Sequence, residues 1–363
     1  MSAVRRGTAS LSHFAWPGAP LALASAILFG ISTPVAKLLL GGGVNPLLLA
    51  GLLYLGSGFG LGFVHLVSRV VGPGSREAAL KRSDLPRLGL VVLFGGVIGP
   101  ALLMLGLTVT PASSASLLLN LEALATMLIA WVAFRENVDR RLLIGAAAIM
   151  AGAVLLSWQG GVEGFGLGAL AISGACLAWG IDNNLTRKLS AGDPVQIAFI
   201  KGLAAGGANF TFAIAAGAHL PSISGVGGAL LVGFFGYGVS LVLFVLALRY
   251  LGAARTGAYF ATAPFIGAVL SIAMFNEPVT LRLIVVGVLM GFGVYLHLSE
   301  THEHEHEHDA LEHEHRHVHD AHHQHAHRPD DPLGEPHSHS HQHSPMRHRH
   351  PHYPDLHHRH EHA

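Results

Sequence analysis

Apolar residues run through positions 19–298 as ten long segments separated by short polar connections. A bilayer hydrocarbon core about 30 Å thick requires roughly 20 predominantly apolar residues per helix, and each segment is close to that length. Ten segments of this length argue against the alternative, buried helices of a soluble core. We therefore predict ten transmembrane helices. The expected ranges are 19–40, 46–68, 87–108, 112–134, 140–158, 165–186, 194–217, 226–249, 254–275 and 280–298.

Lys and Arg are concentrated in alternate connections between these predicted helices. The segment before the first helix and the connections after the second, fourth, sixth and eighth helices are basic. No Lys or Arg occurs in the connections 41–46, 108–112, 159–165 and 217–226. Because cytoplasmic loops of membrane proteins are enriched in Lys and Arg, the pattern predicts a multi-pass protein of the cell (inner or plasma) membrane with both termini in the cytoplasm.

Two of the apolar segments have the same layout at a separation of 141 residues. Leu117–Glu136 and Ala258–Glu277 each combine small residues, an interruption, an apolar run and a closing Glu. Phe29–Lys37 (FGISTPVAK) and Trp179–Lys188 (WGIDNNLTRK) form a second similar pair. Since each half holds five predicted helices, an odd number, the second copy must enter the membrane from the opposite side. Inverted repeats of this kind are a recurrent plan of secondary transporters.

The chain resembles the EamA type of the drug/metabolite transporter superfamily. The resemblance lies in the two five-helix halves, the Phe/Trp-Gly element near the start of each half and the sequence NLEALATMLIAWVAFRE in the fourth span. It covers about residues 19–298. It implies a secondary transporter, a permease and frequently an exporter, which moves small organic metabolites or drugs by alternating access between the repeats.

The predicted fold class is therefore an all-α integral membrane protein with ten transmembrane helices in two inverted five-helix repeats and a disordered His-rich tail. The expected domains are a cytoplasmic segment 1–18, EamA-like repeats 19–158 and 159–299, and a cytoplasmic tail 300–363. The family often has Pro after the Glu inside the fourth span. Ala123 stands at that position here, whereas Pro264 is present in the second copy, so we expect the first copy to be less kinked.

Composition supports the membrane assignment and separates the tail from the rest. The chain is 51% hydrophobic and 12% charged, whereas soluble domains are about 25% charged. The net charge of zero averages two regions. Residues 1–299 hold 17 Lys/Arg and 9 Asp/Glu, while residues 300–363 hold 5 Lys/Arg, 13 Asp/Glu and 23 of the 27 His.

Glu122 is the main candidate for a transport residue. It lies about ten residues from either end of its predicted helix, and ionisable groups inside a span are costly and indicate function by default. The carboxylate could bind a substrate cation or exchange a proton, or it could be a structural acid bonded to a neighbouring helix. Asn120 either shares this polar site or forms a contact between helices.

Asp182 and Asn183 lie about one turn from the cytoplasmic end of the sixth predicted helix. Lys201 lies about two turns into the seventh helix, at a similar depth. We predict an Asp182–Lys201 ion pair, which would serve either as an inner gate or as a structural contact.

Three further charged positions lie near span ends. Lys37 is close to the outer end of the first helix, where it either extends its stem to the headgroups or contacts substrate. Glu136 and Glu277 are expected to cap helix ends or to pair with Arg135 and Arg282.

Pro34, Pro100 and Pro264 interrupt apolar runs. Because proline removes a backbone hydrogen bond and kinks a helix, we predict three helix breaks of the kind that line transporter cavities. Trp residues are expected to anchor the membrane interfaces. They are Trp16, Trp131, Trp158 and Trp179.

The tail after Thr301 consists largely of His, Glu and other polar residues, so it cannot form an apolar core and we expect it to be disordered. His-rich tracts indicate metal binding, and imidazole suits Zn, Ni, Co and Cu. The alternative is a solvating or pH-responsive tail. The candidate ligands are His302, His304, His306, His308, His313, His315, His317 and His319.

Two functional hypotheses follow, a permease with an accessory tail and a Ni/Co/Zn exporter or metal buffer that uses the tail. The scattered His65, His219 and His297 argue against a metal pathway through the core. No nucleophile–base set, phosphate loop or HExxH-type motif indicates an enzyme, and no basic stripe indicates nucleic-acid binding. The expected partners are the lipid bilayer and a small-molecule substrate, with tail-bound metal ions and a homodimer left open. No cofactor is expected to be required.

Overall fold

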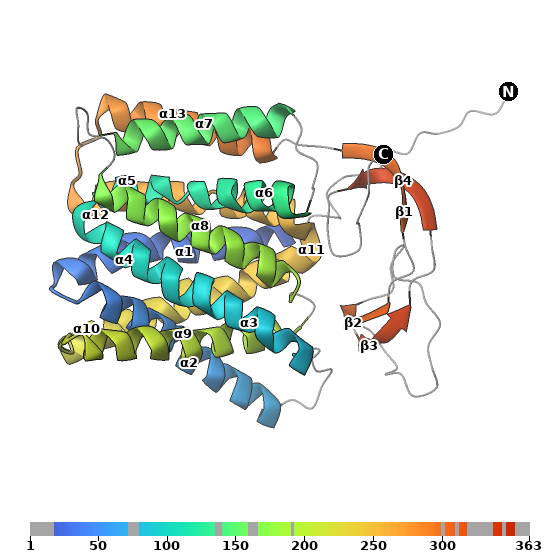
Figure 1. The fold of residues 1–363 in the computed structure, drawn as a ribbon, viewed down its shortest axis with the longest axis horizontal. Coiled ribbons are helices and arrows are strands. Elements are labelled where there is room, and N and C mark those ends of the chain that lie inside the picture. Colours follow the sequence, from blue (N-terminus) through green and yellow to red (C-terminus); the bar gives the residue numbers. More distant parts are fainter. Residues whose placement is uncertain are drawn as a thin grey trace.

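A computed structural model describes residues 18–71, 80–134, 140–158, 166–189 and 192–298, together with four strands in the tail. The helices form a bundle with roughly parallel long axes, with α7 and α13 at one edge and α2 and α9 at the opposite edge (Figure 1). Seven helical segments in the described chain are long and apolar enough to cross a membrane, and shorter apolar helices occupy Ala263–Phe275 and Leu281–His297. The core is therefore an all-helical, multi-pass membrane domain, as predicted.

The first half supplies helices that coincide with the first five predicted segments. In chain order they are α1 (Gly18–Gly41), α2 (Pro46–Val71), the 3₁₀-helix η1 (Arg82–Asp84), α3 (Leu85–Val91), the π-helix η2 (Val92–Ile98), α4 (Gly99–Val109), α5 (Ala112–Leu118), α6 (Leu121–Phe134) and α7 (Arg140–Ser157). Because α3, η2 and α4 follow one another directly, they make one continuous segment across the bundle.

The second half supplies the remaining helices. They are α8 (Leu167–Arg187), α9 (Pro194–Ala215), α10 (Ile223–Val232), the π-helix η4 (Gly233–Val239), α11 (Ser240–Phe260), α12 (Ala263–Phe275) and α13 (Leu281–Leu298). In α11 the ring centroids of Phe244 and Phe260 are 4.9 Å apart, although a straight helix would separate these residues by about 24 Å. The helix therefore turns back on itself between them, where the sequence predicts a connection between two spans.

The two halves interleave instead of packing as separate bodies. α2 packs against α9, and α7 packs against α13. α1 packs on α11 and α12, whereas α8 packs on α4 and α6. Each of these contacts joins one half to the other, so the centre of the bundle is a surface shared by both.

Glycines permit the close approach of α2 and α9. A Cβ added to Gly58 would lie 2.6 Å from the backbone nitrogen of Leu203, and one added to Gly206 would lie 2.5 Å from that of Leu55. Side chains at these positions would separate the two helices. Small residues at such contacts are typical of membrane helix packing, because van der Waals contact supplies much of the association energy there.

The fourth span is interrupted in both halves, in the first copy at residues 119–120 without the proline that we expected to be needed for a pronounced kink. α5 ends at Leu118 and α6 starts at Leu121. Between them, the Asn120 side-chain amide donates to the carbonyl of Leu117 at 3.0 Å. In the second copy, the Thr262 hydroxyl likewise donates to the carbonyl three residues earlier, at 2.7 Å. Polar side chains that bond to the preceding turn compete with the helical pattern, so a break arises without proline.

The three prolines differ in their effect on the helices. α1 continues through Pro34, so no break occurs there. Its packing against α11 and α12 supports the helix across the missing backbone bond, as neighbouring helices commonly do in membranes. Pro100 lies in the first turn of α4 directly after η2, and Pro264 lies in the first turn of α12 directly after the second break.

The described parts of the tail are strands, whereas the sequence predicts disorder. β1 (His302–His308) pairs antiparallel with β4 (Met346–His352), and β2 (Glu312–His317) pairs antiparallel with β3 (His337–Gln342). In the first pair Glu305 is opposite Arg349 and Glu307 is opposite Arg347.

Candidate functional site

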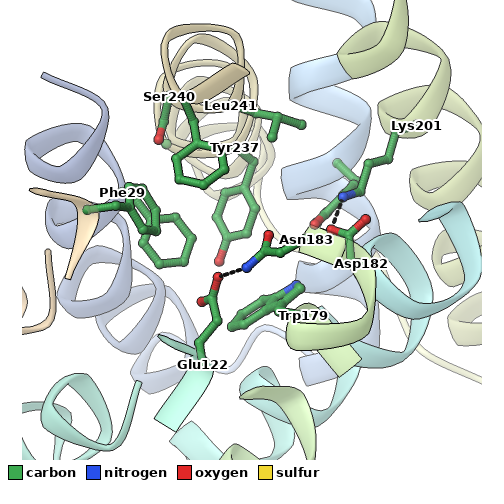
Figure 2. A pocket seen from close by; sticks show the side chains of 13 residues that line it. Phe29, Glu122, Trp179, Asp182, Asn183, Lys201, Tyr237, Ser240 and Leu241 are labelled. Carbon is green, nitrogen blue, oxygen red and sulfur yellow. Dashed lines mark hydrogen bonds and ion pairs between the residues drawn. The ribbon is translucent and has the colours of Figure 1, made fainter. Parts of the chain in front are cut away.

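A cavity of about 70 Å³ lies between helices of the two halves (Figure 2). Its walls come from α1, α2 and α6 of the first half and from α8, α9, η4 and α11 of the second. The lining residues are Phe29, Tyr54, Glu122, Trp179, Asp182, Asn183, Lys201, Gly236, Tyr237, Ser240, Leu241, Phe244 and Phe260. Four of the six predicted pathway residues are among them, namely Glu122, Asp182, Asn183 and Lys201.

Glu122 reaches the cavity because the fourth span breaks immediately before it. It is the second residue of α6, so its carboxylate projects from a new helix start. The Asn183 side-chain amide donates to Glu122 Oε1 at 2.9 Å and to Thr126 Oγ1 at 3.2 Å. Thr126 Oγ1 donates in turn to the Glu122 carbonyl at 2.8 Å. These contacts link α6 to α8 and fix the carboxylate on the cavity wall.

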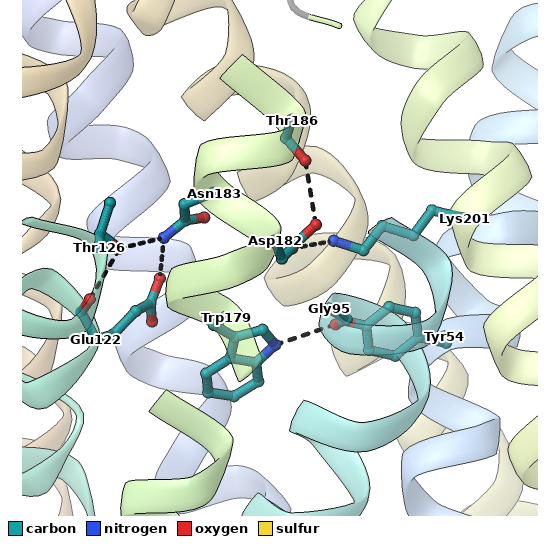
Figure 3. A network of polar contacts seen from close by, with 9 residues as sticks. All are labelled: Tyr54, Gly95, Glu122, Thr126, Trp179, Asp182, Asn183, Thr186 and Lys201. Carbon is teal, nitrogen blue, oxygen red and sulfur yellow. Dashed lines mark hydrogen bonds and ion pairs between the residues drawn. The ribbon is translucent and has the colours of Figure 1, made fainter. Parts of the chain in front are cut away.

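The predicted Asp182–Lys201 ion pair is confirmed. Lys201 Nζ lies 2.5 Å from Asp182 Oδ2, and the two side chains are only 4% and 6% exposed. The Thr186 hydroxyl donates to Asp182 Oδ1 at 3.1 Å (Figure 3). Since a buried charge requires a partner, the two opposite charges neutralise each other. Glu122 then remains as the lining carboxylate without an ion-pair partner in the described chain.

The π-helix η2 accepts hydrogen bonds from two side chains that line the cavity. The Gly95 carbonyl accepts from the Tyr54 hydroxyl at 2.6 Å and from Trp179 Nε1 at 3.0 Å (Figure 3). Asn209 Nδ2 donates to the neighbouring Gly96 carbonyl at 3.0 Å. Polar side chains from α2, α8 and α9 thus bond to two consecutive carbonyls of this π-helix.

Trp179 is therefore a buried cavity residue and not the interface anchor that we expected. It is 5% exposed and its ring meets that of Phe29, with centroids 6.0 Å apart. The two residues stand at corresponding positions in the FGIS and WGID elements. That correspondence was a signal for two aromatic residues facing one site. By contrast, nothing in the sequence marks Tyr54 or Tyr237 as cavity residues.

Asn120 lies outside the cavity and forms a contact between helices. It is 1% exposed, and its amide nitrogen lies 3.8 Å from the sulfur of Met290 in α13. Its side-chain oxygen has no hydrogen-bond partner among the described residues. Of the two interpretations left open by the sequence, the structure places Asn120 in the helix contact.

Lys37 and Glu277 bind helix ends at the end of the bundle where α1 finishes. The Lys37 ammonium donates to the carbonyls of Leu107 and Thr110, the latter at 3.0 Å, near the end of α4. Glu277 accepts from the backbone amide of Ala112 at 2.8 Å, at the start of α5. Lys37 thus lies away from the cavity, with its ammonium bound to protein carbonyls.

Of the two roles expected for Glu277, a helix cap or a pair with Arg282, the structure shows the cap. Arg282 donates to carbonyls at the end of α7, including that of Leu156 at 3.1 Å. Arg135 and Glu136 lie outside the described residues.

Metal-ligand geometry is absent from the part of the bundle that the structure describes, where no group of three or more His, Cys, Asp or Glu side chains comes together. Seven of the eight candidate tail ligands lie in β1 and β2, and His319 lies outside the described residues.

A membrane bundle whose two halves share a central cavity, lined by aromatic rings, a carboxylate and an ion pair, has the architecture of a transporter. Comparison with known proteins identifies the family. Residues 16–158 and 166–299 each match the sequence model of the EamA-like transporter family, so the chain belongs to that family and to the drug/metabolite transporter superfamily.

One relative is described as an uncharacterized transporter of Methanothermobacter thermautotrophicus. It is 30% identical over 292 residues, covering 76% of this chain and 84% of the relative. One solved crystal structure, 20% identical, matches with a TM-score of 0.58 over 77% of this chain and 94% of that chain. This second likeness concerns the fold alone.

Proposed function

We propose that the protein is a secondary transporter that exports a small organic molecule across the cell membrane by alternating access to the central cavity. The observation that carries the proposal is the cavity itself, which both halves line and which contains Glu122 next to a neutralised ion pair. Substrate sites of inverted-repeat transporters lie near the bilayer midplane at the repeat interface. The outward direction comes from the family resemblance.

The proposal includes ten spans in two inverted repeats, 19–158 and 159–299. Several observations support it. The family model matches twice, and the π-helices η2 and η4 begin 141 residues apart, at Val92 and Gly233. The helix contacts also fit a twofold exchange of the halves, because α2 packs on its counterpart α9 and α7 packs on its counterpart α13.

In this arrangement both termini face the cytoplasm, and the Lys37–Glu277 end of the bundle faces outward. Support comes from the Lys and Arg residues of alternate connections, which are typical of cytoplasmic loops. The capping contacts of Lys37 and Glu277 with α4 and α5 then lie on the outer side. These contacts hold the outer helix ends together, and we propose that they loosen when the cavity opens outward.

Alternating access can be tested without knowledge of the substrate, because the chain has a single cysteine, Cys176, which is buried. In a Cys176→Ala background, Asn183→Cys is exposed to a membrane-impermeant thiol reagent from either side of sealed vesicles. We expect labelling from both sides, because the cavity opens to each in turn. Met290→Cys is the control, since Met290 is fully buried in α13 and should not react. Labelling of Asn183→Cys from one side only would contradict the proposal.

A second candidate function, metal binding by the tail, is supported by strand register. His304 is opposite His350 and His306 is opposite His348 in β1–β4, while His315 is opposite His339 in β2–β3. The register therefore brings several His positions opposite one another in both ladders. Imidazole suits Zn, Ni, Cu and Co. We propose that the tail buffers such ions beside the transporter.

Removal of residues 300–363 distinguishes the two roles. The truncated protein should lose most bound Zn or Ni in equilibrium dialysis and keep its transport of organic solutes. If the truncated protein binds as much metal as the full chain, the tail is not the metal site. If truncation abolishes cellular resistance to Ni, Co or Zn, the tail takes part in metal export and is not merely accessory.

A further inference from the structure

The cavity has the composition of a site for an organic cation. We propose that the substrate is a small organic monocation, a protonated amine or a quaternary ammonium compound, which is held by Glu122 and a surrounding group of aromatic rings. This inference rests on the proposed transport function and specifies the class of its substrate.

The charge balance of the cavity favours a cation. Among the lining residues the carboxylates and amines are Glu122, Asp182 and Lys201. Because Asp182 and Lys201 form an ion pair, an ionised Glu122 leaves one net negative charge. An isolated charge in a poorly solvated site is costly, and a monovalent cation compensates this one.

The hydrogen-bond donors of the cavity argue against an anionic substrate. The ammonium of Lys201, the amide of Asn183, the hydroxyl of Tyr54 and the indole of Trp179 each donate at least one hydrogen bond to an acceptor of the protein itself. The buried Tyr237 hydroxyl is the exception, since it has no hydrogen-bond partner in the described part of the chain. One hydroxyl matches the single polar group of a small amino alcohol better than it matches a carboxylate or phosphate.

Aromatic rings surround the space next to the carboxylate. Phe29 is their centre, with its ring centroid 5.8 Å from that of Tyr237 and 5.3 Å from that of Phe260. The Tyr54 and Tyr237 ring centroids are 5.4 Å apart. In Figure 2 the rings of Phe29, Tyr237 and Trp179 gather around the end of the Glu122 side chain. Aromatic faces attract cations, and groups of such rings recognise quaternary ammonium ligands.

The size of the cavity limits the substrate. Its volume is about 70 Å³, and one water needs roughly 10–15 Å³, so about five to seven water-sized groups fit. Pockets for drug-sized ligands occupy about 300–1,000 Å³. This conformation therefore favours a cation of a few heavy atoms.

Equilibrium binding to the full-length protein in lipid nanodiscs tests the proposal. The probe is radiolabelled choline, with competition by tetramethylammonium, by methylammonium and by 3,3-dimethylbutan-1-ol, a neutral molecule with the shape of choline. We expect the cations to compete and the neutral alcohol to compete at least about tenfold less well. Absence of binding by every cation, or equal competition by the neutral alcohol, would overturn the proposal.

Variants of the site provide the second part of the test. Glu122→Gln should weaken choline binding at least about tenfold and Phe29→Leu about three- to tenfold, while Phe29→Tyr, which keeps the ring, should bind as the wild type does. Asp84→Asn, an acid-to-amide change on the bundle surface, serves as the control.

Unfolding temperatures identify variants that fail to fold, and Phe29→Tyr remains informative in that case. Undiminished binding by both Glu122→Gln and Phe29→Leu would contradict the proposal. If Asn183→Cys is labelled from both sides but no cation binds, the transport proposal stands and this one fails.

Discussion

The fourth span of the first half and its counterpart in the second half share a break but differ in the residues that come directly after the break. After Leu119–Asn120 the first half continues with Glu122, whereas after Ala261–Thr262 the second half continues with Pro264. At the offset of 141 residues Glu122 corresponds to Ala263 and Ala123 to Pro264, so only the first copy directs a carboxylate into the cavity. The two halves therefore share the helix break but not the charged side chain that follows it.

The first spans of the two halves differ as well, but here the second half carries the acid. In the aligned elements FGIS and WGID, Ser32 of α1 corresponds to Asp182 of α8. Both helices contribute an aromatic ring to the cavity, Phe29 and Trp179, but only α8 contributes an acid. Two halves that share helix contacts and aromatic positions thus carry different charges around the cavity.

The largest expected effect follows from removing one member of the Asp182–Lys201 ion pair, which only the second half carries. Asp182→Asn alone leaves the Lys201 ammonium buried without its acid, which we expect to destabilise the protein by about 3–5 kcal/mol. Chemical unfolding in detergent measures the change. The double variant Asp182→Asn/Lys201→Met should recover most of this loss, because no buried charge remains. A double variant as unstable as the single one would show that the pair is not the cause.

Substitution of Gly95 tests whether the π-helix η2 must lie close to the Asp182–Lys201 pair. A Cβ at Gly95 would collide with Asp182 Oδ2 and would lie 2.6 Å from Lys201 Nζ. Gly95→Ala should therefore displace the pair and cost roughly 1–3 kcal/mol. Gly207→Ala in α9 is the matched control, since nothing lies within 4 Å of its added Cβ. We expect Gly207→Ala to be neutral or slightly stabilising, and equal losses for the two variants would contradict the proposed contact.

The two breaks give the smallest and most specific comparison. Asn120→Ala and Thr262→Ala each remove one side-chain bond to the preceding turn, at a cost of about 1 kcal/mol each. Asn120 lies two residues before Glu122, so Asn120→Ala should also lower transport, by about threefold for a displacement worth about 0.7 kcal/mol. Thr262→Ala should leave transport near the wild-type rate. Equal transport by the two variants would show that the first break does not position Glu122.

The helices were predictable from sequence because the thickness of a bilayer fixes the length of an apolar run. α1, α2 and α7 thus begin and end close to their expected residues. The inward position of Glu122 was also predictable, since an acid inside an apolar span needs a polar environment.

Other features could not be read from the sequence because they depend on contacts between distant segments. Phe29 and Tyr237 lie in apolar runs where a ring facing lipid and a ring facing a cavity look alike. The π-helix η2 depends on side chains from α2, α8 and α9. The break at Asn120 depends on a polar side chain that bonds within its own turn, whereas proline is the usual sequence signal for a helix break.

The most direct test of the central claim, that Glu122 in the shared cavity binds the transported molecule, is solute uptake into proteoliposomes. Wild type, Glu122→Gln and Asp84→Asn are incubated with a mixed panel of small organic cations, anions and neutral solutes, and the contents are measured by mass spectrometry. We predict that at least one solute accumulates with wild type and Asp84→Asn, and that its uptake falls at least about tenfold in Glu122→Gln, equivalent to about 1.4 kcal/mol, with an unchanged unfolding temperature. Uptake by a folded Glu122→Gln variant equal to that of wild type for every accumulated solute would contradict the claim.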